Sequence, residues 1–569
     1  MNLLPVPRSV HLDGPRVPAT EPVVVIDAID ASLPAEGYRL TIDAGGVRVV
    51  AADDAGAFYA RATLDQLRRL SDDGTVPSGS VEDWPDLEVR AVMLDISRDK
   101  VPTMATLEAL IDRLASWKVN QVQLYMEHTF AYRDHQVVWA DADPLTAEEV
   151  RELDAFCRAR YVELVPNQNC LGHMDRWLRH DRYRPLAIAP DGFTDMRGRH
   201  HHPTTVQPAA PESLALFDSL LQELLPNFTS RRVNVGLDEP WELTPDRIGD
   251  YLEHVRLLRA LPVLDGREMV MWGDILAMHP DALAALPDGV TVCEWGYEAN
   301  HPFAERCEQL AKAGRPLWTA PGTSAWLTLA GRTANMIGNI DSATAALADS
   351  GGLGTLNTDW GDRGHLQQLP VSDPGFAYGA AIAWCRDTNH GLDLAAALSA
   401  HCYADPTGGL GRAVTAMGNA HTEVGPQLIN ESILAMPVYH PTSVVGRGAS
   451  GGLAVDDLER VAAIVEAALD DASAGAAASG RDDAARVADE VRQTGDLLLH
   501  CGRDQIARLR AGGRLTDVPE ATRRELAANL DTLTERHRDL WLGRNRPGGL
   551  TDSVSVLADL RAAYDGEPG

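Results

Sequence analysis

Eight short apolar runs, separated by segments with helical spacing, constrain the fold of this chain more than any other feature. The runs are RAVMLDI, QVQLYM, YVELVP, RVNVGL, MVMWGDI, VTVCEW, PLWTA and LGTLNTDW, between residues 90 and 360. Each has the length and nearly continuous apolar character of a strand that is buried on both faces. Eight such strands alternating with helices predict a (β/α)₈ TIM barrel, within the α/β fold class.

Two patterns between the runs support the helical assignment. Thr146 and Glu149 have the spacing of a capping box at the start of a helix. The segment after the first run has apolar residues that share one helical face, namely Leu107, Leu110, Ile111, Leu114 and Trp117. Helices that bury one face are the elements that cover a parallel barrel from outside.

The rest of the chain divides into two further regions. Residues 1–88 contain the strand-like runs VVVID, YRLTI and VRVVA and the helical pattern GAFYARATLDQLRRL, and Pro85 marks a boundary. We therefore predict an N-terminal α/β domain (1–88), a barrel (89–408) and a C-terminal helical domain (409–569). Long helices are expected around Leu458 and Leu526, with ASAGAAASG as a linker between them. Their role stays open: they could pack on the barrel, close its mouth or form a homodimer interface.

Composition narrows the classes of partner and compartment. A formal net charge of −31 over 569 residues argues against nucleic acid and anionic membranes as partners, because phosphate groups would be repelled. No apolar run approaches the roughly 20 residues that a membrane span needs, and the N-terminal sequence lacks a signal-peptide pattern. Seven scattered cysteines without a CxxC pair indicate reduced, buried thiols. A cytoplasmic protein is expected.

Two other motifs point to no cofactor. The tract RHHHP places three histidines in succession, which cannot all face one ion from regular structure, so a solvated loop is expected. GRGASGG lacks the Lys-Ser/Thr of a phosphate-binding loop and is interpreted as a linker. We expect neither a metal ion nor an organic cofactor.

Polar and aromatic residues follow the predicted strands at their carboxyl ends, where the active site of such a barrel lies. The adjacent acids Asp238 and Glu239 follow the fourth strand directly. Carboxylates, one arginine and several tryptophans at one rim suggest a sugar site, although plain packing at the barrel mouth would explain any single tryptophan. The remaining candidates are Asp95, Arg98, Glu127, His128, Asn169, His173, Trp272, Asp274, Trp295, Tyr297, Trp326, Trp360 and Asp362.

Several of these segments, taken in order, resemble glycoside hydrolase family 20, the β-N-acetylhexosaminidases. They are GAFYARATLDQL, DWPDLEVRAVMLDISRD, VPNQNCLGHMDRW, VNVGLDE and NTDWGD, and the resemblance covers about residues 1–400. It implies a zincin-like accessory domain before the barrel. It also implies an exo-acting retaining enzyme that removes a terminal β-linked GlcNAc or GalNAc from a carbohydrate substrate.

The resemblance assigns roles to individual residues. In this family the 2-acetamido group of the substrate attacks the anomeric carbon and forms an oxazoline, so the protein supplies no nucleophile. Asp238 would hold the acetamide N–H, and Glu239 would protonate the leaving oxygen and then activate water. Arg98 would bind the 3- and 4-hydroxyls, with an ion pair to Asp95 as the structural alternative. Trp360 and Asp362 would form the floor and a hydroxyl anchor, and His173 would belong to a polar network near the acid.

Asp362 stands where the resemblance implies the glutamate of a Trp-x-Glu motif and is one methylene shorter. The chain departs from the family pattern in two further places. LYMEHTFAY replaces the usual segment after the second strand, so Glu127 and His128 stand where other groups are found. The usual tyrosine for the acetamide carbonyl has no counterpart in TAPGTSAWLTL, and Tyr297 is a candidate replacement. These departures leave two alternatives open: a related glycosidase for a different or modified sugar, and a catalytically silent sugar-binding protein.

Overall fold

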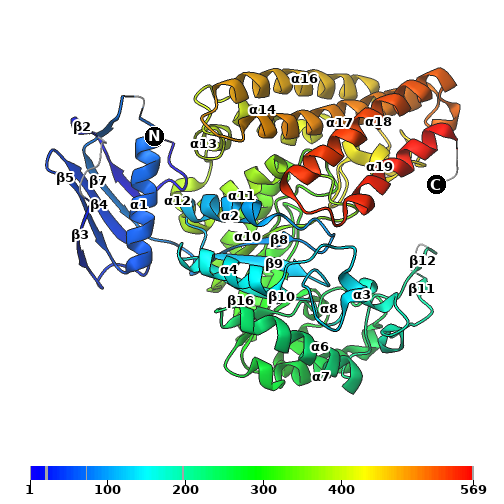
Figure 1. The fold of residues 1–569 in the computed structure, drawn as a ribbon, viewed down its shortest axis with the longest axis horizontal. Helices are drawn as coiled ribbons and strands as arrows, with labels where there is room; N and C mark the ends of the chain where they lie inside the picture. The colour runs from blue at the N-terminus through cyan, green and yellow to red at the C-terminus, as the bar shows by residue number, and fades with distance from the viewer. Residues whose placement is uncertain (1, 19–23, 72, 195–197, 567–569) are drawn as a thin grey trace.

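The central feature of the computed structural model, which describes residues 2–18, 24–71, 73–194 and 198–566, is a closed barrel of eight parallel strands. Neighbouring strands follow the chain order, and the last strand pairs with the first. Figure 1 shows the barrel at the centre of the molecule. Its strands are β8 (Val89–Asp95), β9 (Gln121–Met126), β10 (Glu163–Gln168), β13 (Arg232–Asn234), β14 (Glu268–Trp272), β15 (Val290–Trp295), β16 (Leu317–Ala320) and β17 (Gly354–Asp359).

All eight predicted runs form these strands, so the predicted barrel is confirmed. Every residue of β8, β9 and β17 is buried, as expected for strands that pack on a filled interior and on helices outside. Strand β13 is shorter than the run RVNVGL, because the chain leaves the extended conformation at Gly236 and Leu237, which have φ angles of +68° and +73°.

Helices surround the barrel and bury one face each. The predicted capping box is present: Thr146 accepts a hydrogen bond from the N–H of Glu149, and the Glu149 side chain accepts one from Thr146. The predicted apolar face is buried at Leu107, Leu110, Ile111 and Leu114. The long helices of this layer are α2 (Met104–Ser116), α4 (Ala147–Arg158), α6 (Pro211–Leu224), α7 (Ile248–Arg259), α9 (Phe303–Lys312), α10 (Thr333–Ser350) and α11 (Leu369–Trp384).

The N-terminal region forms a separate small layer of sheet and helix (Figure 1). Helix α1 (Asp54–Arg69) packs on a five-stranded sheet with the order β1-β7-β4-β5-β3. Its core joins the barrel through a buried ion pair of 2.7 Å between Asp83 and Lys118. The strands are β1 (Ser9–His11), β3 (Val24–Ile29), β4 (Tyr38–Asp43), β5 (Gly46–Ala51) and β7 (Gly79–Asp83), with β2 (Arg16–Pro18) and β6 (Thr75–Pro77) as a separate pair.

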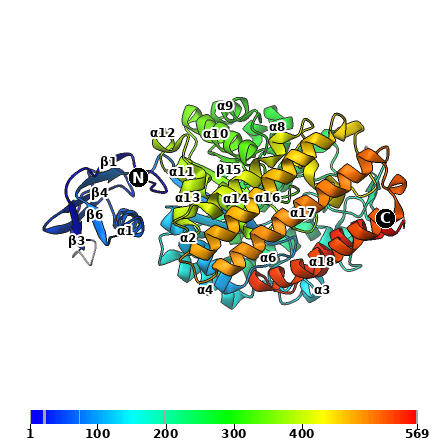
Figure 2. The same ribbon diagram turned by 90° about the horizontal axis from the view of Figure 1, so that it is seen from above.

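The C-terminal region is helical, as expected, and lies along one side of the barrel (Figures 1 and 2). Helix α11, which is buried from Pro370 to Trp384, contacts both the barrel strand β17 and helices of this region, so the two parts share a core. The helices are α13 (Leu394–His401), α14 (Gly409–Asn419), α16 (Val455–Ala478), α17 (Ala484–Arg510), α18 (Glu520–Arg544) and α19 (Leu550–Asp565). Short elements elsewhere are α3 (Gln136–Trp139), α5 (Asp175–Leu178), α8 (Asp274–Met278), α12 (Arg386–Asn389), α15 (Met436–Tyr439), β11 (Phe193–Thr194) and β12 (His200–His201).

The linker predicted at ASAGAAASG is wrong, because α16 continues through most of it and ends at Ala478. Alanine is the strongest helix former, and the small residues allow α14 to approach closely. A Cβ atom on Gly475 would lie 2.5 Å from the backbone N of Leu410. Small side chains here mark a tight helix crossing.

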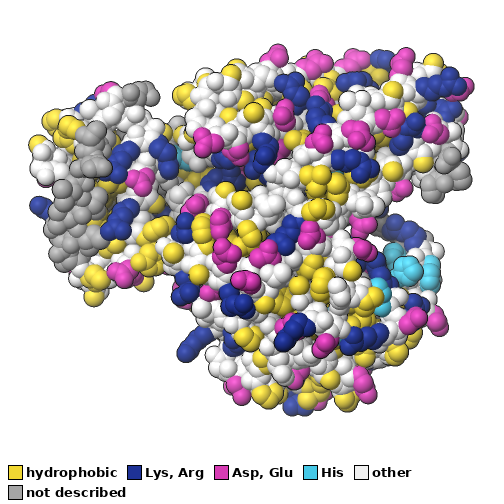
Figure 3. Space-filling view, in the orientation of Figure 1, with side chains coloured by type: hydrophobic (Ala, Val, Ile, Leu, Met, Phe, Trp, Pro, Cys, Tyr) yellow, Lys and Arg dark blue, Asp and Glu magenta, His cyan; other side chains and the backbone are white. Residues whose placement is uncertain are grey.

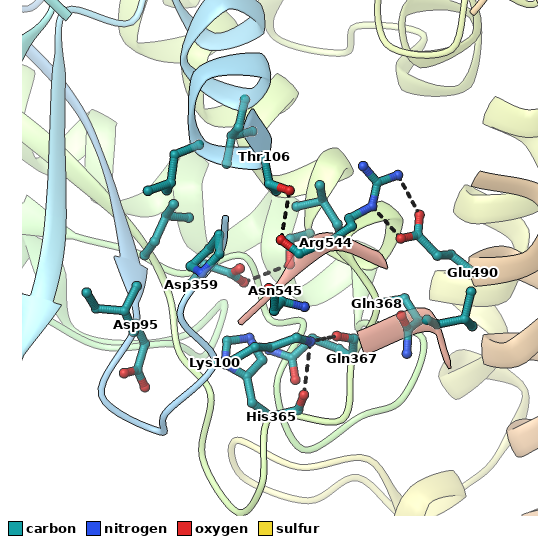
Figure 4. A pocket seen from close by; sticks show the side chains of 18 residues that line it. Asp95, Lys100, Thr106, Asp359, His365, Gln367, Gln368, Glu490, Arg544 and Asn545 are labelled. Carbon is teal, nitrogen blue, oxygen red and sulfur yellow. Dashed lines mark hydrogen bonds and ion pairs between the residues drawn. The ribbon is translucent and has the colours of Figure 1, made fainter. Parts of the chain in front are cut away.

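A cavity of about 60 Å³ with a mainly apolar lining lies at the joint between the barrel and the C-terminal helices (Figure 4). Lys100 Nζ donates hydrogen bonds to the carbonyl oxygens of His365 (3.1 Å) and Gln367 (2.7 Å). Burial lowers the pKa of Lys100 to about 8. Thr106 donates to the carbonyl of Arg544 at 2.7 Å, which joins α2 to the end of α18. The Thr106 bond therefore connects the C-terminal region to the barrel, whereas the Lys100 bonds hold the loop between β17 and α11.

Other sequence expectations concern the cysteines and membrane spans. All seven cysteines are free and buried, as predicted. Within the described ranges, the helices lack the combination of length and apolar character that spanning a bilayer requires.

Candidate active site

The acids Asp238 and Glu239 lie at the carboxyl end of the barrel in a turn with unusual backbone angles. Gly236, Leu237 and Glu239 all have positive φ, and glycine is the residue that adopts this conformation most easily. A Cβ on Gly236 would lie 2.6 Å from Cγ of Asn169, so this glycine also allows the third and fourth strand ends to meet. A non-glycine residue with positive φ, such as Leu237 or Glu239, raises the free energy of the folded state by about 1–3 kcal/mol, and such residues concentrate at functional sites.

The two acids have different surroundings. Asp238 is 5% exposed, and its Oδ1 accepts a 2.8 Å hydrogen bond from Asn169 Nδ2. The Glu239 side chain is 29% exposed, and its backbone N–H donates to Asp274 Oδ2 at 3.1 Å. The pair therefore consists of one carboxylate held in a fixed orientation and one that faces an open space.

His173 joins the two acids. Its Nε2 atom lies 3.3 Å from Asp238 Oδ2 and 3.4 Å from Glu239 Oε2. Burial would lower the pKa of His173, but the charge of Asp238 and the contacts with both acids raise it well above the ordinary value. Burial would also raise the pKa of Asp238, but His173 and Asn169 lower it overall. Because of these two pKa shifts, His173 is charged and Asp238 is ionised at neutral pH.

Arg98 is held by carboxylates on three sides. Its guanidinium lies 3.2 Å from Asp95, 3.2 Å from Glu127 and 3.4 Å from Asp362. It also lies 5.6 Å from the ring centroid of Trp360, within the range of a cation–π contact. Burial raises the pKa of Glu127 to about 7, although Arg98 opposes this shift. These contacts fix the orientation of the Arg98 guanidinium, whereas the guanidinium of an ordinary surface arginine is free to move.

Aromatic rings form one side of the site. Trp360 lies 6.1 Å from Trp272 between ring centroids, and its Nε1 donates a 2.7 Å hydrogen bond to the hydroxyl of Tyr297. Trp295 stacks on Tyr297 at 5.3 Å with an interplanar angle of 23°. Rings fixed in this way present flat apolar faces beside the polar groups.

The structure brings most of the candidate residues together around one open cavity of about 120 Å³. Six candidates do not line it. Asp95 and Glu127 contact Arg98, Asn169 donates to Asp238, Asp274 accepts from the Glu239 N–H, and Trp326 packs edge-on against Tyr297 at 5.0 Å. His128 also lies away from it, in an ion pair of 2.7 Å with Asp99. The cavity is lined by Arg98, His173, Asp238, Glu239, Trp272, Trp295, Tyr297, Trp360, Asp362 and Asn430.

Sequence reasoning missed Asn430, which comes from the C-terminal region. Its backbone N–H donates a 2.7 Å hydrogen bond to Glu298 Oε1, and Glu298 also pairs with Arg332 at 2.7 Å. The backbone N–H of Asn430 therefore attaches this segment to the loop that follows β15. Its positive φ of +58° is tolerated by asparagine, but no pattern in the sequence connects this position with the strand ends.

Across the described residues, the only group of three that could hold a metal ion is His173, Asp238 and Glu239, whose ligand atoms lie within 4.8 Å of one another. The same atoms fit a proton-transfer network equally well, because each carboxylate already faces the histidine. The tract RHHHP forms part of the β11–β12 hairpin, where His201 stacks on Phe193. Figure 3 shows histidine side chains on the surface there. The expected exposure is therefore present, but His200 and His201 belong to strand β12 and not to a loop.

Comparisons with known proteins agree on one family. Residues 2–84 match the model of "Glycosyl hydrolase family 20, domain 2", and residues 88–346 match that of "Glycosyl hydrolase family 20, catalytic domain". The second match ends before β17, so Trp360, Asp362 and Asn430 lie outside it.

Individual relatives are distant. A β-hexosaminidase of Akkermansia muciniphila is 27% identical over 239 residues, covering 38% of this chain and 48% of the relative. A lacto-N-biosidase of Bifidobacterium bifidum is 26% identical, covering 37% of this chain and 18% of that protein. The chain thus spans less than half the length of these two relatives. A solved family 20 β-N-acetylhexosaminidase from Streptomyces coelicolor shares the fold, with a TM-score of 0.54 and 18% identity, covering 70% of this chain and 94% of that one.

Proposed function

Because this chain belongs to glycoside hydrolase family 20, we propose that it is an exo-acting retaining β-N-acetylhexosaminidase that removes a terminal β-linked GlcNAc or GalNAc. The observation that carries the proposal is the division between two adjacent acids. Asp238 is buried, ionised and fixed by Asn169, whereas Glu239 faces the cavity. Neighbouring residues with such different environments suit two different tasks in one reaction.

The proposed mechanism uses the acetamide of the substrate as the nucleophile. Its carbonyl oxygen attacks the anomeric carbon, and an oxazolinium ion forms as the glycosidic bond breaks. Asp238 accepts a hydrogen bond from the acetamide N–H and stabilises the positive charge that develops on the oxazolinium ring. Glu239 gives its proton to the leaving oxygen and then takes a proton from the water that opens the oxazolinium, so configuration is retained.

Other residues bind the sugar in this proposal. The Tyr297 oxygen accepts a hydrogen bond from Trp360, which leaves its own proton to be donated to the acetamide carbonyl. Arg98 and Asp362 are oriented by one another and bind ring hydroxyls. The faces of Trp272, Trp295 and Trp360 pack against the apolar side of the sugar, as aromatic rings at sugar sites do.

The test compares nitrophenyl glycosides of GlcNAc, GalNAc and glucose with the wild-type protein and Glu239→Gln. We expect turnover of the acetamido sugars alone and tight inhibition by a thiazoline that mimics the oxazoline. Glu239→Gln should lose about 10²–10⁴-fold in kcat on a glycoside with a poor leaving group, the usual contribution of a general acid. A covalent sugar–protein ester, or normal turnover by the variant, would refute the mechanism.

The two alternatives give different results in the same test. A glycosidase for another sugar would favour the glucoside or a modified sugar, and the shorter Asp362 in the position of the family's glutamate is the feature that favours this alternative. A silent sugar-binding protein would bind the thiazoline without turnover. The proposal also includes a cytoplasmic location, supported by seven buried free thiols, which cell fractionation would test.

A further inference from the structure

A second, larger hollow of about 600 Å³ continues directly from the candidate active site. We call it the leaving-group groove. It shares Glu239, Trp295, Tyr297 and Asn430 with the smaller cavity, so the two form one continuous space that meets at the acid.

The walls of the groove expose large apolar side chains to solvent. Trp241 is 60% exposed, Met278 is 65% exposed and Ile429 is 83% exposed, and all three line the groove. They come from the turn after β13, the end of α8 and the C-terminal segment next to Asn430, which are far apart in sequence. When exposed apolar residues from separate elements come together in one patch, the patch usually marks a binding surface.

The charged groups of the groove already have partners. Glu294 pairs with His301 at 3.0 Å, Glu298 pairs with Arg332, and Arg306 donates to the carbonyl of Ala277. These groups are therefore not free to bind the many hydroxyls of a second sugar. The exposed apolar surface, by contrast, is free to bind an alkyl or aryl group. Carboxylates also outnumber cations along the groove, which disfavours an anionic occupant.

The position of Glu239 identifies which part of a substrate would lie here. In the proposed reaction this residue protonates the glycosidic oxygen, and the leaving group is bonded to that oxygen. The sugar occupies the small cavity on one side of Glu239, so the leaving group continues on the other side, into the groove. Binding energy from such a remote part of the substrate can be used in catalysis.

We propose that the leaving-group groove binds a large, apolar aglycone without negative charge, so that the substrate is a β-N-acetylhexosaminide of an alkyl or aryl alcohol rather than an oligosaccharide. The inference rests on the proposed function. Trp241, Met278 and Ile429 are the residues that determine this preference.

The experiment measures kcat/KM for methyl and octyl β-N-acetylglucosaminides, whose leaving alcohols have closely similar acidity, and for N,N'-diacetylchitobiose. A fully buried methylene strengthens binding by roughly fourfold, so partial burial of the octyl chain should raise kcat/KM at least about 20-fold over methyl. The octyl compound should also exceed the disaccharide. A 7-carboxyheptyl glycoside should lose most of the advantage because of its charge.

Variants test which surface is responsible. Ile429→Ser and Trp241→Ala should reduce the octyl-to-methyl ratio by about tenfold, whereas Leu542→Ala, at a half-exposed leucine on α18 outside the groove, should leave it as in the wild-type protein. Equal rates on methyl and octyl glycosides, or preference for the disaccharide, would overturn the inference while the proposed function stands. Absence of turnover on every acetamido sugar would overturn both.

Discussion

The hydroxyl of Tyr297 accepts a 2.7 Å hydrogen bond from Nε1 of Trp360, which ties the end of the sixth barrel strand to the end of the eighth. The bond fixes the direction of the remaining hydroxyl proton. In the proposed mechanism, this orientation would let Tyr297 take the place of the tyrosine that the seventh-strand loop lacks.

Tyr297→Phe should therefore lower kcat/KM on nitrophenyl N-acetylglucosaminide by about 10²–10³-fold, the usual effect of removing one donor to a developing charge. The loss should lie mainly in kcat, because the acetamide oxygen is more polarised in the transition state. Tyr378→Phe is the matched control, since that hydroxyl bonds to Asp341 on the outer helices. Full activity of Tyr297→Phe would exclude the role.

His173→Gln should move the acidic limb of the pH profile to higher pH. The charged histidine lowers the pKa of Asp238, so its removal raises that pKa, and Asp238 becomes protonated earlier as the pH falls. Profiles of kcat/KM against pH measure the shift. His390→Gln, at an exposed ion pair with Asp341, should keep the wild-type profile. An unmoved limb in His173→Gln would show that the two residues are not coupled.

Asp274→Asn should stabilise the protein at neutral pH. Burial and nearby Asp238 raise the pKa of Asp274 from 3.8 to about 7, so between these values the folded state binds a proton that the unfolded state has lost. Stability at this site therefore falls as pH rises from about 4 to 7. The melting temperatures of variant and wild type should coincide near pH 4 and separate by a few degrees at pH 8. A constant difference at all pH values would contradict the linkage.

Glu298→Ala should loosen the segment that carries Asn430. Glu298 accepts a hydrogen bond from the Asn430 N–H and pairs with Arg332, so its loss removes both contacts. We expect faster hydrogen exchange around residues 428–432 and a KM several-fold higher, because one wall of the cavity becomes mobile. Glu459→Ala, at an exposed pair with Arg510, is the control. Unchanged exchange would show that other contacts hold the segment.

The barrel could be predicted from the sequence because its signals are local. Strand β8, for example, is a continuous buried run. Asp238 comes directly after the run RVNVGL, which contains β13, so the barrel topology alone brings this residue to the mouth. The sequence is less informative about positions that depend on packing between distant segments. Trp326 also lies beyond the end of a barrel strand, yet it packs against Tyr297 and does not line the cavity.

Two features could not be predicted for physical reasons. The composition around Gly475 is equally suitable for a flexible linker and for a close helix crossing, and only the neighbouring α14 decides between them. Asn430 reaches the cavity because Glu298 holds its backbone, and a backbone hydrogen bond between distant segments leaves no trace in residue types. Sequence patterns therefore identified the acid pair but not the wall beside it.

The place of Asn430 in the chain has a consequence for synthesis. A ribosome releases the strands from β8 to β17 before it reaches this residue, and domains generally begin to fold as they emerge. A nascent barrel can therefore form with its acids in position while the pocket still lacks one side. Activity should begin only after the C-terminal helices have docked, because a prematurely terminated product would lack one wall of the pocket and would expose the face of α11 that those helices cover.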